Sequence, residues 1–379
     1  MRNEKEKAEE QKDKVRVGIT QGDINGIGYE VIMKAFSDNR IFDYCTPVLY
    51  GSSKVASYHR KTLNLTNFNF NPVKRADQAN PRRANIINVY DAEARIDLGK
   101  STETAGKLSL ISLRAAINDL KQNRFEALVT APINKQNIQS EDFHFPGHTE
   151  YLAQEFSATD VLMIMVSDQM RIGVATGHIP IHEVPAALTK ELLLEKLKSM
   201  NHSLNRDFGI AKPRIAVMGL NPHASDEGLL GKEEQETIIP AIEDAFDKGI
   251  LAFGPYPADG FFGTLQFRNF DGILAMYHDQ GLIPFKTLSF DNGVNFTAGL
   301  PVVRTSPGHG TGYDIAGKNE ASPDSFREAL VLAADIYKNR IEWDQIHENP
   351  LHENIMMKQS GNEEDEDLPD EANEHHPVI

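Results

Sequence analysis

The sequence predicts an α/β protein built around a largely parallel sheet. Short apolar runs, which suit buried strands, alternate with longer stretches whose apolar residues recur at helical spacing. Polar segments rich in Gly and Pro follow the strand-like runs, as the loops of such a fold do. With 379 residues, of which 40% are hydrophobic, the chain is long enough for two domains with separate cores.

Eight short strands are expected along the chain. They are expected at residues 15–20, 46–50, 85–90, 127–130, 161–166, 171–175, 214–218 and 272–276. Helical spacing is clearest at residues 108–120, 191–204 and 233–247. Five polar loops, GDINGIG, APINK, TGHIPIH, GLNPHA and YHDQGLIPFK, each follow an expected strand. Because ligands of open α/β sheets bind beyond the carboxyl ends of strands, we expect these loops on one edge of one sheet.

The composition argues against several classes of partner. The 39 Lys and Arg against 55 Asp and Glu give a net charge of −16, which repels nucleic-acid backbones. The N-terminus is charged without an apolar stretch, and no apolar run approaches the ~18 residues of a membrane span. The single cysteine, Cys45, excludes an internal disulfide and fits the cytoplasm. Charged, disordered segments are expected at residues 1–14 and 361–379.

Neither glycine-containing segment carries a nucleotide-binding fingerprint. GDINGIG lacks the Gly-x-Gly-x-x-Gly spacing, so a tight strand-to-helix turn is its simpler interpretation. Residues 312–319 have the Gly-x4-Gly-Lys spacing of a phosphate loop, but Asn319 stands where a Ser or Thr would bind Mg²⁺. The sequence therefore does not indicate a nucleotide hydrolase.

Three histidines predict a metal site. His178, His223 and His278 each follow an expected strand within a loop that contains Gly or Pro. Neutral imidazole is the most common metal ligand in proteins, and three protein ligands with an open position are typical of catalytic metal sites. His182 lies four residues after His178, but the intervening Pro180 disfavours a helical ligand pair.

Cationic and acidic residues accompany these histidines. Lys286, Asn295 and Arg304 lie on one segment downstream of the third histidine. Lys and Arg near a metal would suit a substrate that carries a phosphate and a carboxylate. Asp259 and Asp279 are candidates to orient a ligand or to take a proton.

Several motifs together are specific enough to indicate a family. They include QGDINGIGYE, TAPINK, GHTEYLA, GLNPHA, GPYPADGFF, AMYHDQGLIPFK and GVNFTAGLPVVRTSPGHGTGYDIAGK. Between residues 15 and 339 the chain resembles the 4-hydroxythreonine-4-phosphate dehydrogenases of vitamin B6 biosynthesis. The resemblance implies two α/β domains with the active site in the cleft between them, as in isocitrate and isopropylmalate dehydrogenases. The implied boundaries are an arm at 1–14, a first domain at 15–138 and 300–345, a second at 139–299, and an extension at 346–379.

The resemblance also implies a homodimer whose subunits share each active site. One divalent metal, Zn²⁺, Mg²⁺ or Co²⁺, would be held by His178, His223 and, from the partner chain, His278. The implied substrate contacts are His148, Thr149, Lys286, Asn295 and Arg304. NAD would lie against His309, Gly310, Asp314 and Lys318.

The implied reaction is an NAD-linked oxidation and decarboxylation of 4-phosphooxy-L-threonine to 3-amino-2-oxopropyl phosphate, CO₂ and NADH. A bound metal would lower the pKa of the substrate hydroxyl. Lys286, Asp259 and Asp279 stay alternative catalytic residues for the proton transfer. The GDINGIG loop and Asn319 depart from the family pattern, which leaves phosphorylated sugar acids such as 4-phospho-D-threonate or 4-phospho-D-erythronate open as substrates. A metal-dependent hydrolase and a non-catalytic metabolite-binding protein are the alternatives from other classes.

Overall fold

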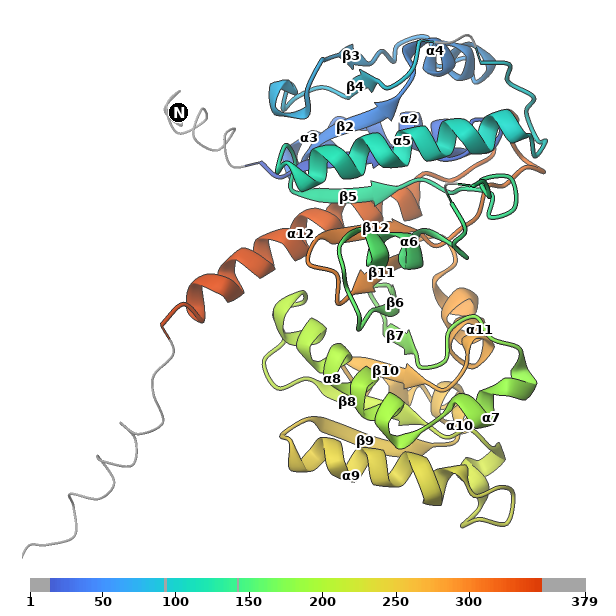
Figure 1. The fold of residues 1–379 in the computed structure, drawn as a ribbon, viewed down its shortest axis with the longest axis vertical. Coiled ribbons are helices and arrows are strands. Elements are labelled where there is room, and N and C mark those ends of the chain that lie inside the picture. Colours follow the sequence, from blue (N-terminus) through green and yellow to red (C-terminus); the bar gives the residue numbers. More distant parts are fainter. Residues whose placement is uncertain (1–13, 92–93, 142, 350–379) are drawn as a thin grey trace, which may run out of the picture. The chain divides into compact units, whose positions relative to one another are not determined.

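A twelve-stranded sheet forms the framework of the chain in the computed structural model (Figure 1). The structure describes residues 14–91, 94–141 and 143–349. Among the described residues, those up to 340 form one compact unit, and 341–349 belong to a second. The segments expected to be disordered, 1–14 and 361–379, lie outside the described residues apart from Lys14. The division of residues 15–345 into two domains stays a prediction.

Eight strands of the sheet are those expected from the sequence, each within two residues at either end. The strands are β1 Arg16–Thr20, β2 Thr46–Gly51, β3 Asn71–Pro72, β4 Asn85–Asn88, β5 Ala127–Thr130, β6 Leu162–Val166, β7 Arg171–Val174, β8 Arg214–Met218, β9 Leu251–Tyr256, β10 Gly272–Ala275, β11 Val294–Ala298 and β12 Val303–Pro307. The sequence does not predict β3, β9, β11 and β12. In space the order is β3-β4-β2-β1-β5-β12-β11-β6-β7-β10-β8-β9. The α/β class and the largely parallel sheet are confirmed.

Strand direction reverses in the middle of the sheet. β1, β5 and β12 run parallel, whereas β11 is antiparallel to both of its neighbours, β12 and β6. β6 is in turn antiparallel to β7, and β7, β10 and β8 run parallel to one another. The carboxyl ends of β1 and β5 therefore point opposite to those of β7, β10 and β8. The prediction that all five polar loops share one edge is wrong, because the antiparallel pairings around β11 turn the second half of the sheet around.

The helices connect the strands and cover both sheet faces. They are α2 Gly28–Phe36, α3 Ile41–Tyr44, α4 Ser53–Thr62, α5 Glu103–Lys121, α6 His148–Glu155, α7 Val184–Ala187, α8 Lys190–Arg206, α9 Ile239–Asp247, α10 Ala258–Gly263, α11 His278–Ser289 and α12 Asp324–Ile346. The three predicted helices are present, and α5 begins early because the Thr102 side chain accepts from the Ala105 N–H. A π-helical turn at Glu234–Ile238 leads into α9. Among the described helices, none combines the length and the apolar character that crossing a bilayer requires.

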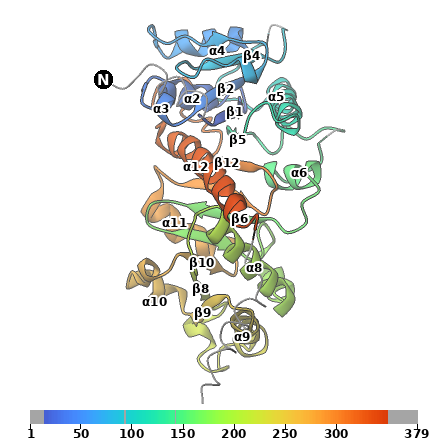
Figure 2. The ribbon, with the colours of Figure 1, turned by 90° about the vertical axis from the view of Figure 1, so that its left-hand side faces the viewer.

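Both faces of the sheet are buried. On one face, apolar side chains form a continuous cluster with α2, α8, α9 and α12. On the second face, α5 covers the end of the sheet that contains β2 and β5. The opposite end of this face, over β7, β8 and β10, is covered by α10 and α11. Figure 2 shows α5 across the sheet from α12. Between these two clusters, polar side chains on β5, β11 and β12 replace apolar ones. They are Thr130, Asn295, Thr297, Arg304 and Ser306.

The GDINGIG loop is an internal junction. Residues 20–33 are all buried. Asp23 Oδ2 accepts from Asn137 Nδ2 at 2.8 Å and from the Tyr313 hydroxyl at 2.7 Å. A Cβ on Gly26 would lie 2.5 Å from the carbonyl oxygen of Thr311, so only glycine allows these segments to approach. These contacts support the interpretation of the loop as a strand-to-helix turn.

His59 is buried beneath this loop. Its ring stacks on Tyr29 with centroids 5.0 Å apart, and Nε2 donates to the carbonyl oxygen of Ile24 at 2.9 Å. Burial lowers the pKa of His59 from 6.5 to about 4, and the hydrogen bond to Ile24 opposes part of that shift. The folded protein therefore holds this imidazole in its neutral form at neutral pH.

We expect acid to destabilise the fold through His59. Between about pH 6.5 and pH 4 only the unfolded chain binds the proton, so the free energy of unfolding falls as the pH falls. The loss from this residue is about 2 kcal/mol near pH 5. Urea denaturation at neutral pH and near pH 5 measures it in the wild type and in His59→Gln, which cannot take up the proton. The same pH dependence in both proteins would contradict the assignment.

Candidate active site

A cavity of about 230 Å³ lies where polar side chains interrupt the second face of the sheet. Its lining draws on both groups of strand-end loops, because Lys135 follows β5 whereas His178 and His278 follow β7 and β10. Nine of the predicted site residues line it. They are His148, Thr149, His178, His278, Lys286, Asn295, Arg304, His309 and Gly310.

Arg304 is a buried cation in this cavity, with only 3% of its surface exposed. Its Nε and Nη2 atoms donate to Oγ1 of Thr130 at 3.1 and 2.7 Å, and Nη1 donates to Oγ1 of Thr297 at 3.1 Å. Burial lowers the pKa of Arg304 to about 10, against the opposing effect of Glu150, so the group stays charged at neutral pH. A buried cation that is bonded to hydroxyl oxygens favours an anionic ligand.

Three lining residues carry a buried polar atom that has no hydrogen-bond partner among the described residues. These atoms are His148 Nε2, Asn295 Oδ1 and His309 Nε2. Buried polar atoms are normally hydrogen-bonded, so a ligand in the cavity is their natural partner. Burial lowers the pKa of His309 and of His148, and Arg304 and Lys135 add to the effect on His148. Both imidazoles are therefore neutral at neutral pH.

His178 and His278 form a pair at the cavity. Their ring centroids are 5.3 Å apart. Nδ1 of His278 lies 2.7 Å from Asp279 Oδ1, so Nδ1–H donates a hydrogen bond to the carboxylate and Nε2 is left for another partner. Desolvation, then repulsion from Lys135 and from His278, lowers the pKa of His178. Two imidazoles this close fit part of the donor set of a divalent metal.

His223 is not among the residues that line the cavity, although β8, which precedes it, is the neighbour of β10. Its backbone is left-handed, with φ of 54°, and so are the four non-glycine residues that follow. Within the part of the chain that the structure describes, no three His, Cys, Asp or Glu side chains are placed to hold one metal ion. One chain thus brings His178 and His278 together, whereas the resemblance implies that His278 comes from the partner chain. The convergence of His223 stays a prediction.

Four other predicted residues lie outside the cavity lining. Asp279 is bonded to His278, and Asp259 lies in α10. Asp314 and Lys318 are exposed on the segment that continues from the cavity at Gly310.

Sequence reasoning assigned no role to four polar residues that line the cavity, Thr130, Lys135, Glu150 and Ser306. Lys135 and Glu150 belong to the motifs APINK and GHTEYLA, so their motifs were the available signal. Ser306 lies on β12, on the same sheet face as Arg304, and only the strand alternation would have placed it there.

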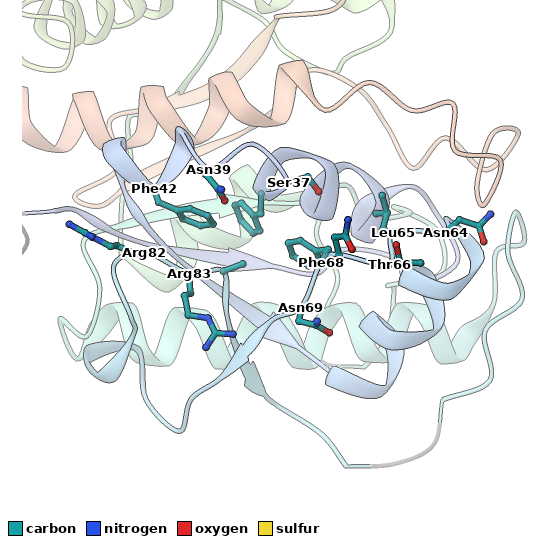
Figure 3. Close-up of a pocket in the computed structure, with 13 residues that line it drawn as sticks. Ser37, Asn39, Phe42, Asn64, Leu65, Thr66, Phe68, Asn69, Arg82 and Arg83 are labelled. Carbon is teal, nitrogen blue, oxygen red and sulfur yellow. The ribbon is translucent and has the colours of Figure 1, made fainter.

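A second cavity, of about 520 Å³, lies beside α2 and α3. Figure 3 shows Phe42 and Phe68 there, together with polar side chains such as Asn39 and Arg82. No residue predicted for the site lines it, and none of its lining residues has an unpartnered buried polar atom among those that the structure describes. We therefore place the candidate site at the smaller cavity.

Comparison with known proteins identifies relatives along most of the chain. Residues 43–333 match the family model described as pyridoxal phosphate biosynthetic protein PdxA. The chain is 52% identical over 349 residues to the 4-hydroxythreonine-4-phosphate dehydrogenase of Bacteroides thetaiotaomicron, covering 92% of this chain and 96% of that protein. It is 41% identical over 321 residues to the enzyme of the same name from Sulfurihydrogenibium sp., covering 84% and 97%.

Solved structures agree with the sequence relatives. The crystal structure of 4-hydroxythreonine-4-phosphate dehydrogenase from Klebsiella pneumoniae is 32% identical with a TM-score of 0.74, over 86% of this chain and 98% of that one. A terephthalate 1,2-cis-dihydrodioldehydrogenase from Burkholderia xenovorans is 27% identical with a TM-score of 0.56, over 85% and 98%. The chain belongs to the PdxA family of pyridoxal phosphate biosynthetic proteins.

Proposed function

We propose that this chain is a metal-dependent, NAD-linked 4-hydroxythreonine-4-phosphate dehydrogenase of pyridoxal phosphate biosynthesis. It would oxidise and decarboxylate 4-phosphooxy-L-threonine to 3-amino-2-oxopropyl phosphate, CO₂ and NADH. The observation that carries the proposal is the buried, hydroxyl-bonded guanidinium of Arg304 in a cavity that also holds two adjacent imidazoles. Relatives at 52% and 41% identity bear this enzyme name.

The cavity offers cationic side chains for the anionic groups of the substrate and unpaired polar atoms for its polar groups. Arg304 would bind an anionic group from the buried side, and Lys135 would approach it from the exposed side. His148 Nε2 and Asn295 Oδ1, which lack partners among the described side chains and backbone, would bind the polar groups of the amino acid moiety. Two anionic ends and a polar centre are the features of a phosphorylated hydroxy-amino acid.

His178 and His278 would hold the divalent metal, with His223 as the third ligand. When bound, such a metal lowers the pKa of the substrate hydroxyl and stabilises negative charge that develops on that oxygen. Asp279 orients the ring of His278 by accepting a hydrogen bond from its Nδ1–H group. Imidazole ligands favour Zn²⁺ or Co²⁺ over Mg²⁺.

NAD would lie along residues 309–318. The first two of these residues line the cavity, and the buried Nε2 of His309 has no partner there within the part of the chain that the structure describes. Asp314 and Lys318 are exposed farther along the segment, where they would contact the cofactor. NAD supplies the hydride acceptor of the reaction.

Lys286 is our choice for the residue that takes the hydroxyl proton. It lines the cavity, whereas the other two candidates, Asp259 and Asp279, do not. Asp279 already accepts a hydrogen bond from His278. A proton acceptor must come within hydrogen-bond reach of the group that it deprotonates.

A homodimer with shared sites, in the cytoplasm, completes the proposal. Ile283, Leu288 and Phe290, in α11 and directly after it, are 63%, 40% and 69% exposed. Apolar side chains exposed on the helix that begins with His278 suit a subunit interface. The buried thiol of Cys45, the single cysteine, is compatible with a reducing compartment.

We expect NADH absorbance and CO₂ release in equal amounts when 4-phosphooxy-L-threonine, NAD and a divalent metal are added, and no reaction after chelation. Turnover of 4-phospho-D-threonate or 4-phospho-D-erythronate in its place would reassign the enzyme to phosphorylated sugar acids. Product formation without nucleotide would indicate a metal-dependent hydrolase. Substrate binding without turnover would indicate a metabolite-binding protein.

Arg304→Gln should raise the KM for the substrate about 10–100-fold, with a smaller effect on kcat, because the guanidinium holds an anionic group throughout the reaction. Steady-state kinetics measures both constants. Arg40→Gln is the control, because Arg40 is exposed and pairs with Asp38 at the surface. An unchanged KM in Arg304→Gln would remove this residue from the substrate site.

His178→Ala, His223→Ala and His278→Ala should each lower kcat/KM by at least about 100-fold, because each removes a metal ligand. Their melting temperatures should stay close to that of the wild type, since loop ligands contribute little to the core. His182→Ala is the matched control, because that side chain is 77% exposed on the loop after His178. Full activity in His223→Ala would exclude it as the third ligand.

A further inference from the structure

The side chain of Gln280 joins two strand ends where their backbone pairing stops. The last paired residues of β10 and β8 are Leu274 and Val217. Beyond them, the Met276 N–H donates to Oε1 of Gln280 at 2.7 Å. Nε2 of Gln280 donates to the carbonyl oxygen of Gly219 at 2.6 Å. The side-chain amide therefore adds one more link between the two strands, in place of a backbone peptide group.

The same line of bonds continues to β7. The Ala175 N–H donates to the carbonyl oxygen of Ala275 at 2.8 Å. Oγ1 of Thr176 donates to the carbonyl oxygen of Met276 at 2.8 Å. Met276 is thus held through its carbonyl on the β7 side and through its N–H on the β8 side. One chain of hydrogen bonds connects the ends of the three strands that precede the predicted metal ligands.

The bonds of Gln280 lie next to two of these ligands in the sequence. Met276 lies two residues before His278, and Gly219 lies four residues before His223. Gln280 itself lies two residues after His278, in the first turn of α11. A side chain in the loop of one histidine is therefore bonded to the loop of another.

The backbone of the loop that carries His223 is hydrogen-bonded at three consecutive residues, 219–221. Glu234, which is fully buried, accepts from the N–H groups of Leu220 and Asn221 at 2.7 and 2.8 Å. Gln280 holds the carbonyl of the preceding residue. Glu234 fixes the His223 loop to the π-helical turn that leads into α9. Of the bonds described here, only those of Gln280 fix the loop to the end of β10.

We propose that Gln280 is a positioning residue that fixes the His223 loop relative to the strand end that leads to His278, and thereby sets the divalent-metal affinity of the site. The inference rests on the proposed metal-dependent function. An uncharged amide suits this place because it supplies one acceptor for the Met276 N–H and one donor for the Gly219 carbonyl. Loss of a residue that orients metal ligands typically weakens metal binding about 10–100-fold.

Titration calorimetry of Co²⁺ into the full-length protein, without NAD or substrate, tests the inference. Gln280→Leu removes both hydrogen bonds at similar side-chain volume, and its Kd should rise about 10–100-fold. Gln280→Glu keeps an acceptor for Met276 but loses the donor to Gly219, so its Kd should rise as well. Gln169→Leu, in the exposed turn before β7, is the matched control and should bind as the wild type does.

Two further measurements separate positioning from a general structural effect. Turnover by Gln280→Leu should recover at saturating metal, because the reacting groups are intact. In the metal-free protein, amide hydrogen exchange over residues 219–231 should be faster in Gln280→Leu than in the wild type, with little change elsewhere.

Each outcome decides a different point. If the wild type binds Co²⁺ and folded Gln280→Leu binds it within about twofold, the inference is overturned while the proposed function stands. If the wild type binds no divalent metal, the metal-dependent function fails and the inference fails with it. If Gln280→Leu does not fold, the same comparison made with Gln280→Glu decides the question.

Discussion

The buried guanidinium of Arg304 is the constraint on which the organisation of the site depends. β12 lies inside the sheet between β5 and β11, so its side chains are removed from water on both faces. A cation at this position needs polar neighbours, and Thr130 and Thr297 on the adjacent strands supply hydroxyl oxygens where apolar side chains would otherwise pack. This polar band separates the two apolar clusters of that face, and the cavity lies over it. The proposed anionic substrate would complete the charge balance.

The sequence predicts those strands whose own residues form a short apolar run. β5 and β8 are short and mostly apolar, and their predicted bounds are those of the structure. β11 is not predicted, although Val294 and Phe296 on the core face alternate with Asn295 and Thr297 on the cavity face, a pattern typical of a strand. The reversal of direction has no local signal, because it arises when Val294 pairs with Val166 from a distant part of the chain.

For the candidate site, the sequence predicts a chemistry but no geometry. Residue types alone indicated metal and anion binding, and the individual substrate contacts came from the motif resemblance. Lys135 and Glu150 line the same cavity from separate motifs of the connection between β5 and β6, and the fold of that connection brings them together. His223 is the opposite case, since its motif predicts a ligand but the bonds that fix its loop come from other elements.

The backbone after β8 shows why this loop needs such bonds. Five consecutive non-glycine residues, 223–227, have φ between 48° and 71°. Each left-handed residue of this kind costs on the order of 1 kcal/mol or more of conformational free energy. The conformation therefore persists only where neighbouring groups hold it in place. Glu234 and the contact between Ser225 Oγ and Gln235 Oε1, at 3.0 Å, hold one side of the loop, and Gln280 holds the other. The backbone position of His223 is therefore fixed by hydrogen bonds from neighbouring elements. A cation that binds there would not have to order the loop.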